Sequence, residues 1–116
     1  MKKIIHLASI LLILTACNNS EEEITFPECI RTLIIGYEKN LNYPISNPRS
    51  HIDKYNYKGQ IVYLINDQIG WADGAATLVN EKCESICLLG GIDGNQNDCI
   101  DWDKATFIET IWTDPR

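Results

Sequence analysis

Apolar positions fall into two different patterns along this chain. Ile4–Leu14 is a nearly unbroken apolar run close to the beginning. Further on, apolar residues recur every three or four positions, a spacing that predicts a helix over Pro27–Lys39. Thr25 is the expected N-cap of this helix, and Pro27 lies in its first turn, where a missing N–H costs little.

The remaining apolar segments are short and rich in β-branched or aromatic residues. His51–Tyr57 and Gln60–Ile65 flank Lys58-Gly59 and predict a β-hairpin with a two-residue turn. The other predicted elements are a second hairpin, a helical turn and a last strand: Ala76–Asn80 with Ser85–Leu89, Ile100–Ala105, and Thr110–Thr113. The order predicts an α+β fold in which an N-terminal helix packs on a small, mostly antiparallel sheet of hairpins, stapled by disulfides. The expected core comprises Ile30, Leu33, Ile34, Tyr37, Val62, Leu64, Ile86 and Trp112.

The leading apolar run has the form of an export signal. Two lysines precede it, and a small residue, Ala16, stands directly before Cys17. The run is shorter than the roughly 20 residues that span a bilayer, which argues against a retained membrane helix. Leu14-Thr15-Ala16-Cys17 resembles a bacterial lipoprotein signal, and this resemblance implies that Cys17 is acylated and becomes the first mature residue. An ordinary cleaved signal is the alternative.

These features divide the chain into a signal peptide (1–16), a lipidated acidic tether (17–25) and a single small domain (26–116). Ser20-Glu21-Glu22-Glu23 reads as a solvated tether, because adjacent carboxylates repel one another. The stretch also resembles the serine-plus-acidic signal that sends lipoproteins to the cell surface in some Gram-negative bacteria. Asn18 occupies the position where an aspartate marks inner-membrane retention in enteric bacteria. We therefore expect lipid anchoring in the outer membrane at the cell surface, with its periplasmic face as the alternative.

The charge of the chain argues against some classes of binding partner. Its formal charge is −6, and loss of the two lysines in the leader leaves a mature chain near −8. Nucleic-acid binding demands clustered lysine and arginine, so no nucleic-acid partner is expected. The contact with the membrane should be made by the lipid on Cys17 rather than by a basic patch.

Four cysteines remain beyond Cys17: Cys29, Cys83, Cys87 and Cys99. In a small exported domain they indicate two disulfides, for which three connectivities are open. We expect Cys87–Cys99, closing the glycine-rich loop, and Cys29–Cys83, tying the helix to the second hairpin. A zinc site is the competing interpretation, but the mature chain has a single histidine and no second close cysteine pair. A redox-active pair would more often show a Cys-x-x-Cys motif.

Several short motifs are similar to those of a family of small, uncharacterised bacterial lipoproteins. They are Cys29-Ile30, Tyr55-x-Tyr57-x-Gly59-x-x-Val62-Tyr63, Ile86-Cys87 with Gly90-Gly91, Gly94 before Cys99, and Ile111-Trp112-x-Asp114-x-Arg116. The resemblance spans most of the domain and implies no activity. The family often has a vicinal cysteine pair where this chain reads Gln68-Ile69-Gly70-Trp71-Ala72-Asp73, and Cys83 stands where a glycine is usual.

One acidic segment resembles part of a calcium loop. Asp93, Asn95, Asn97 and Asp101 stand at positions 1, 3, 5 and 9, which supply oxygen ligands in an EF-hand. The pattern departs from an EF-hand at Asp98, where glycine is needed, and at Lys104, where a glutamate belongs. A weak calcium site is therefore one interpretation. The other is an acidic turn that caps the short helix with Asp98 or Asp101, and we expect the domain to fold without metal or cofactor.

Few residues are available for catalysis, so we expect a non-enzymatic protein. A Ser/His/Asp site would have to use His51, and the cysteines are expected to be oxidised. Trp71, on a loop between two glycines, is the best candidate for an exposed ligand contact, together with Asp73. Tyr63, Phe107 and Trp112 are expected to be structural. The leading hypothesis is a binding or accessory module with a protein or glycan partner; an exported peptidase inhibitor and a small hydrolase are the alternatives.

Overall fold

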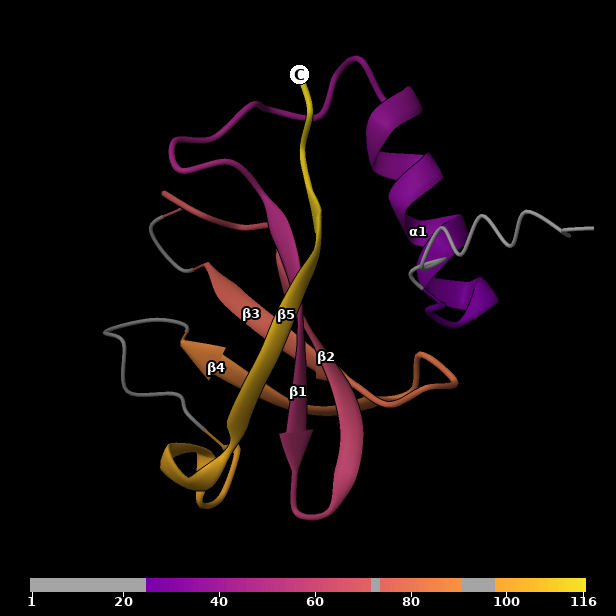
Figure 1. Ribbon diagram of the computed structural model, residues 1–116. Coiled ribbons are helices and arrows are strands. Elements are labelled where there is room, and N and C mark those ends of the chain that lie inside the picture. The colour runs from indigo at the N-terminus through magenta and orange to yellow at the C-terminus, as the bar shows by residue number, and fades with distance from the viewer. Residues whose placement is uncertain (1–24, 72–73, 91–97) are drawn as a thin grey trace, which may run out of the picture.

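The computed structural model describes residues 25–71, 74–90 and 98–116, and the predicted signal peptide and most of the tether lie outside them. In order, the described elements are α1 (Glu28–Lys39), β1 (His51–Tyr57), β2 (Gln60–Asn66), β3 (Ala75–Val79), β4 (Ser85–Gly90), the 3-10 helix η2 (Trp102–Lys104) and β5 (Thr106–Thr113). The strands form one antiparallel sheet in the order β4-β3-β2-β1-β5, with α1 against one side (Figure 1). The predicted α+β class is confirmed. The helix, however, begins only at Glu28 and is not an N-terminal element of the chain.

The first hairpin lies where the sequence predicts it. β1 pairs with β2 from His51 opposite Asn66 to Tyr57 opposite Gln60. The two turn residues, Lys58 and Gly59, have φ values of 51° and 77°. Positive φ at both positions is the requirement of a type I′ turn, whose twist matches that of the strands.

The sheet buries apolar side chains on both faces. The helix-side core contains Ile30, Ile34, Ile52, Tyr63, Ile65, Val79 and Ile111. The far-side core contains Tyr57, Val62, Leu64, Leu78, Cys87 and Cys99, and Trp102 of η2 packs against it. Strand alternation explains the division, since successive residues of β2 point to opposite faces. The single core expected from the sequence is therefore two layers, with Val62 and Leu64 on the side away from α1.

Ile86 is not a core residue as predicted, because it is 42% exposed. The pairing of β3 with β4 shifts here: Leu78 lies opposite Cys87, and Val79 lies opposite Ser85. Ile86 is the extra residue of this β-bulge and is left without a cross-strand partner.

β5 begins four residues before its predicted start at Thr110. A register shift against β1 places Thr110 opposite Asp53 but Trp112 opposite Ile52. Ile111 is therefore an extra residue, and the bulge lets both Ile111 and Trp112 pack against the helix-side core. Phe107, expected to be structural, is 53% exposed but makes an edge-on contact with Tyr55 at 5.5 Å between ring centroids.

Both predicted helix caps were wrong. The N-cap of α1 is Pro27 rather than Thr25, and its carbonyl accepts hydrogen bonds from the N–H groups of Ile30 (3.0 Å) and Arg31 (3.1 Å). Asp101 precedes η2 but makes no side-chain cap. Asp98 instead accepts a hydrogen bond from the N–H of Leu88 (2.5 Å) and donates its own N–H to the Leu88 carbonyl (3.2 Å), which closes part of the outer edge of β4. Among the described residues, no helix is long and apolar enough to cross a membrane.

Candidate functional site

Trp71 lies between β2 and β3 on a loop that is held by its own backbone. The N–H of Trp71 donates to the carbonyl of Gln68 (3.2 Å), and the carbonyl of Trp71 accepts from the N–H of Gly74 (3.1 Å). The side-chain oxygen of Gln68 accepts a further hydrogen bond from the N–H of Ala75 (3.0 Å). Both backbone groups of Trp71 are thus engaged, so the loop fixes the position from which its indole projects.

Glycine is required at both ends of this loop, for a different reason at each position. Gly70 has a φ of 84°, in the region that residues with a Cβ rarely adopt. At Gly74, a Cβ would lie 2.3 Å from the carbonyl oxygen of Gln68, so no side chain fits there. The chain therefore specifies a tight loop around Trp71.

The indole of Trp71 is 48% exposed and borders a concavity of about 230 Å³, here called the Trp71 hollow. Among the described residues, those that line the hollow are all uncharged: Asn66, Gln68, Ile69, Gly70, Trp71, Gly74, Ala75 and Ala76. Within the described part of the chain, neither the side-chain amide of Asn66 nor the side-chain nitrogen of Gln68 has a hydrogen-bond partner. Trp71 is exposed as predicted, and its role as a ligand contact stays a prediction. Asp73, predicted beside it, lies outside the described residues. The two amides were missed, although Gln68 and Asn66 stand only two and four residues before Gly70.

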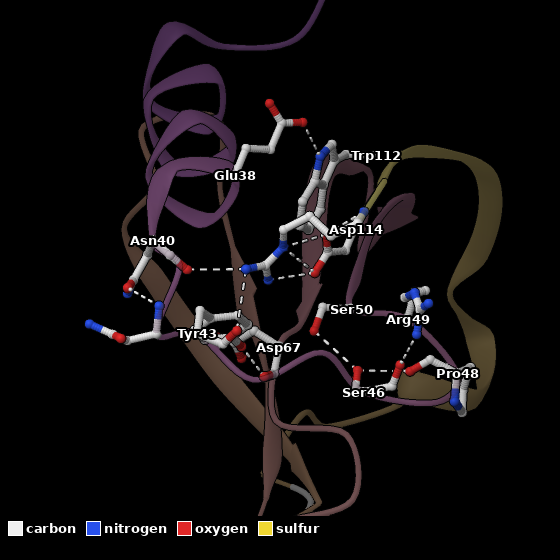
Figure 2. A network of polar contacts seen from close by, with 12 residues as sticks. Glu38, Asn40, Tyr43, Ser46, Pro48, Arg49, Ser50, Asp67, Trp112 and Asp114 are labelled. Carbon is white, nitrogen blue, oxygen red and sulfur yellow. Dashed lines mark hydrogen bonds and ion pairs between the residues drawn. The ribbon is translucent and has the colours of Figure 1, made fainter.

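A polar cluster, centred on the C-terminal tail, joins the tail to the end of α1 and to the loop that follows it (Figure 2). Arg116 donates from Nε to Oδ1 of Asp114 (2.9 Å) and from Nη2 to Oδ2 (2.7 Å). Its Nη1 donates to the carbonyls of Asn40 (3.1 Å) and Tyr43 (3.2 Å), and the N–H of Asp114 donates to the carbonyl of Ser50 (2.8 Å). The hydrogen bonds from Arg116 hold the pKa of Asp114 below its usual value.

Aromatic side chains extend this cluster toward the sheet. Trp112 stacks on Tyr37 with 5.5 Å between ring centroids. Its Nε1 donates to Oε1 of Glu38 (2.9 Å), a bond drawn in Figure 2. The hydroxyl of Tyr37 donates to Oδ2 of Asp67 (2.6 Å), and that of Tyr43 donates to the Asp67 carbonyl. Burial, and then the bond to Asp67, raise the pKa of Tyr37 far above its usual value. The hydrogen bonds of this cluster tie the C-terminal tail to α1 and to the loop that follows it, and so help to close the fold.

His51 is not arranged as the base of a nucleophilic site. Its Nδ1 lies 2.9 Å from the carbonyl oxygen of Arg49, and its Nε2 lies 3.5 Å from Oδ2 of Asp53. The hydroxyl of Thr110 donates to Oδ1 of Asp53 (2.7 Å), not to the imidazole. Nucleophilic activation requires the hydroxyl to be hydrogen-bonded to the base. This trio instead satisfies the carboxylate of Asp53, which is 9% exposed in the sheet.

The predicted disulfides, Cys29–Cys83 and Cys87–Cys99, are confirmed. Cys83 has a φ of 59°, a left-handed conformation that favours glycine, the residue that the family resemblance implies at this position. In the part of the chain that the structure describes, one group of three potential metal ligands lies within 4.8 Å: Cys87, Asp98 and Cys99. Its two cysteines are joined in a disulfide and cannot act as thiolate ligands.

The proposed calcium ligands lie mostly outside the described residues. Asp93, Asn95 and Asn97 belong to the segment 91–97, for which the structure describes nothing. Asp101, the fourth predicted ligand, pairs its Oδ1 with Nζ of Lys104 at 3.7 Å on an exposed surface. The weak calcium site therefore stays a prediction.

Comparison with known proteins gave two family matches. Residues 38–114 match the model of a domain of unknown function (DUF6970), and residues 1–18 match a prokaryotic membrane lipoprotein lipid attachment site. No curated protein and no solved structure matches. The second match supports the predicted lipoprotein signal and implies membrane anchoring through a lipid on Cys17, a residue outside those that the structure describes.

Proposed function

This chain belongs to the family of the domain of unknown function DUF6970 and carries a prokaryotic lipid attachment site, and from these two facts we propose that it is a non-enzymatic binding or accessory lipoprotein at the cell surface. The lipid would hold the domain at the outer membrane. The domain itself would present a rigid contact to a partner outside the cell.

The observation that carries the binding role is the presentation of Trp71. Full burial of a large apolar side chain stabilises a protein by about 1.5–3 kcal/mol, yet this indole stays 48% exposed on a loop closed by hydrogen bonds from both sides. Fixed aromatic side chains give a large contact area at a small cost in conformational entropy, so they dominate many binding surfaces. A loop that a rigid sheet positions is the usual place for such residues.

The non-enzymatic assignment is supported by the state of the reactive side chains. His51 is engaged by the Arg49 carbonyl and Asp53, and the four cysteines described are paired. Hydrolysis of peptide or glycoside panels by the purified protein is the outcome that would overturn this assignment, provided that His51→Ala abolishes it.

The acidic tether supports display at the surface, and Asn18 after Cys17 supports the outer rather than the inner membrane. Digestion of intact cells with an added protease should remove the domain from wild-type cells. Protection in intact cells, with digestion only after the outer membrane is opened, would place the domain on the periplasmic side. Fatty-acid labelling should mark the wild type and miss Cys17→Ala.

The binding role is tested by cross-linking and capture from native membranes. Wild type should enrich a partner, and Trp71→Ala should lose it. Leu41→Ala is a matched control, because Leu41 is 90% exposed and does not line the Trp71 hollow. Equal capture by Trp71→Ala would contradict the assigned contact, and capture of a peptidase that the protein inhibits would favour the inhibitor hypothesis instead.

A further inference from the structure

We infer that the Trp71 hollow binds a neutral carbohydrate, an inference that rests on the proposed binding function and names its ligand class. The hollow combines one half-exposed indole with the amide side chains of Asn66 and Gln68. A sugar ring offers the matching surface: an apolar face of C–H groups and a rim of hydroxyls. The indole suits the face, and the amides suit the rim, since an amide both donates and accepts hydrogen bonds.

The polar groups of the hollow are available to a ligand. The side-chain oxygen of Gln68 accepts a hydrogen bond from the N–H of Ala75, which fixes the side chain. Its side-chain nitrogen has no hydrogen-bond partner among the described residues. The side chain of Asn66 makes no hydrogen bond to any described residue. Binding sites of this kind pair an apolar surface with a few oriented polar groups that set specificity.

The uncharged lining of the hollow and the negative charge of the chain favour a neutral ligand. The described residues that line the Trp71 hollow are all uncharged, whereas a second concavity contains Lys58 with Asp98 and a third contains Glu81, Lys82 and Glu84. The formal charge of −6 for the whole chain opposes phosphorylated, sulfated or acidic ligands. A charged peptide would also bury an unpaired charge in such a hollow, which is costly.

A fourth concavity, beside α1, is also uncharged but is less suited to a sugar. It is lined by Cys29, Thr32, Leu33, Gly36, Tyr37, Asn40 and Tyr43. The hydroxyls of Tyr37 and Tyr43 are already bonded to Asp67, and the Asn40 side chain accepts from the N–H of Asn42 (3.1 Å). Its hydroxyls would have to break internal bonds before they could bind a sugar, which leaves only the side-chain nitrogen of Asn40. The Trp71 hollow offers more: the side-chain nitrogen of Gln68 and the whole side-chain amide of Asn66.

The size of the Trp71 hollow limits how much of a glycan it can hold. Its volume of about 230 Å³ is below the roughly 300–1,000 Å³ of sites that enclose drug-sized molecules. We therefore expect one sugar ring to occupy it, with the rest of the glycan in solvent. Multiple copies on one membrane would then strengthen attachment to a polysaccharide, because each further contact is intramolecular.

The experiment uses the full mature lipoprotein in detergent on an array of neutral oligosaccharides, with heparin as an anionic comparison. We expect binding to at least one neutral glycan and none to heparin. By titration calorimetry with that glycan, Trp71→Ala should weaken binding at least about tenfold and Trp71→Phe much less, since aromatic anchors dominate such contacts. Asn66→Ala should weaken binding severalfold, and Leu41→Ala should leave it unchanged. A thermal melt of each variant shows that the fold is retained.

The outcomes separate this inference from the function on which it rests. Binding that survives both Trp71→Ala and Asn66→Ala, equal binding of heparin, or a blank array would overturn the carbohydrate inference. If the array is blank while membrane capture yields a protein partner lost in Trp71→Ala, the binding function stands and only its ligand class is wrong. If neither assay gives a Trp71-dependent partner, both are refuted.

Discussion

Removal of the Cys29–Cys83 disulfide should cost more stability than removal of Cys87–Cys99, in a ratio set by the two loops that they close. The sequence separations are 54 and 12 residues. By the chain-entropy relation, closing loops of these lengths contributes roughly 4 and 3 kcal/mol to the free energy of unfolding. Cys29 also fixes the start of α1 to the turn before β4, so its loss releases one end of the helix from the sheet.

The residue that replaces Cys83 should matter as well. Cys83 has a φ of 59°, and this left-handed conformation costs a residue with a Cβ roughly 1–2 kcal/mol more than it costs glycine. Glycine also gains about 0.4–1 kcal/mol of entropy in the unfolded chain, which opposes folding. The difference predicts that Cys29→Ala/Cys83→Gly is roughly 0.5–1 kcal/mol more stable than Cys29→Ala/Cys83→Ala.

Equilibrium unfolding in guanidinium chloride without reductant, followed by circular dichroism, measures all four proteins. The expected order of midpoints is wild type, then Cys87→Ala/Cys99→Ala, then the alanine–glycine pair, then Cys29→Ala/Cys83→Ala. Equal stability of the two Cys29 variants, or a higher midpoint for the alanine form, would refute the backbone argument. A smaller loss of stability in Cys29→Ala/Cys83→Ala than in Cys87→Ala/Cys99→Ala would refute the argument from loop length.

Three further changes test the core and the polar cluster. Ile30 is fully buried, so Ile30→Ala should lower the free energy of unfolding by about 2–5 kcal/mol, while Ile35→Ala on the exposed side of α1 should change it little in the same assay. The pKa of Asp114 is lowered in the folded state, so its carboxylate stabilises the fold above its ordinary value of 3.8, and this contribution is lost as the pH falls through the folded pKa. Urea unfolding from about pH 6 to pH 2 should show this fall in the free energy of unfolding. In Asp114→Asn the fall should be smaller, because the contribution of this carboxylate is absent at every pH. The pKa of Tyr37 is raised in the folded state, so the protonated phenol stabilises the fold below about pH 10. This contribution is lost as the pH rises further. Ultraviolet titration of the native protein should show one fewer tyrosine with a raised pKa in Tyr37→Phe than in the wild type.

The parts of the fold that were predictable depend on local rules. The first hairpin follows from alternation and from Lys58-Gly59, both of which act within a few residues. The disulfide pairing followed from placing the cysteines on the predicted helix, hairpin and glycine-rich loop. The exposure of Trp71 followed from the glycines on either side of it, which the structure explains by a positive φ and a close backbone approach.

The parts that were missed depend on register and on distant contacts. A bulge exposes Ile86, and another turns both Ile111 and Trp112 toward α1, and neither bulge has a signal in the sequence. The polar cluster joins Arg116 to Asn40 across 76 residues, a separation at which no pattern of neighbours is informative. The side-chain amides of Asn66 and Gln68 were overlooked because only the folded loop brings them beside Trp71.

The position of the disulfides also determines how the domain carries mechanical load. A lipoprotein held by its lipid is pulled at its N-terminal end, and Cys29 is the second residue of α1. Tension between the anchor and the C-terminus would cross from Cys29 to Cys83, follow the chain to Cys87, and cross again to Cys99. Residues 30–82 and 88–98 lie inside closed covalent loops, so they cannot be drawn out while both bonds are intact. Pulling the two ends in optical tweezers should therefore give a short extension that grows by about 3.5 Å for each residue released when reductant is added, and an equal extension before and after reduction would contradict this load path.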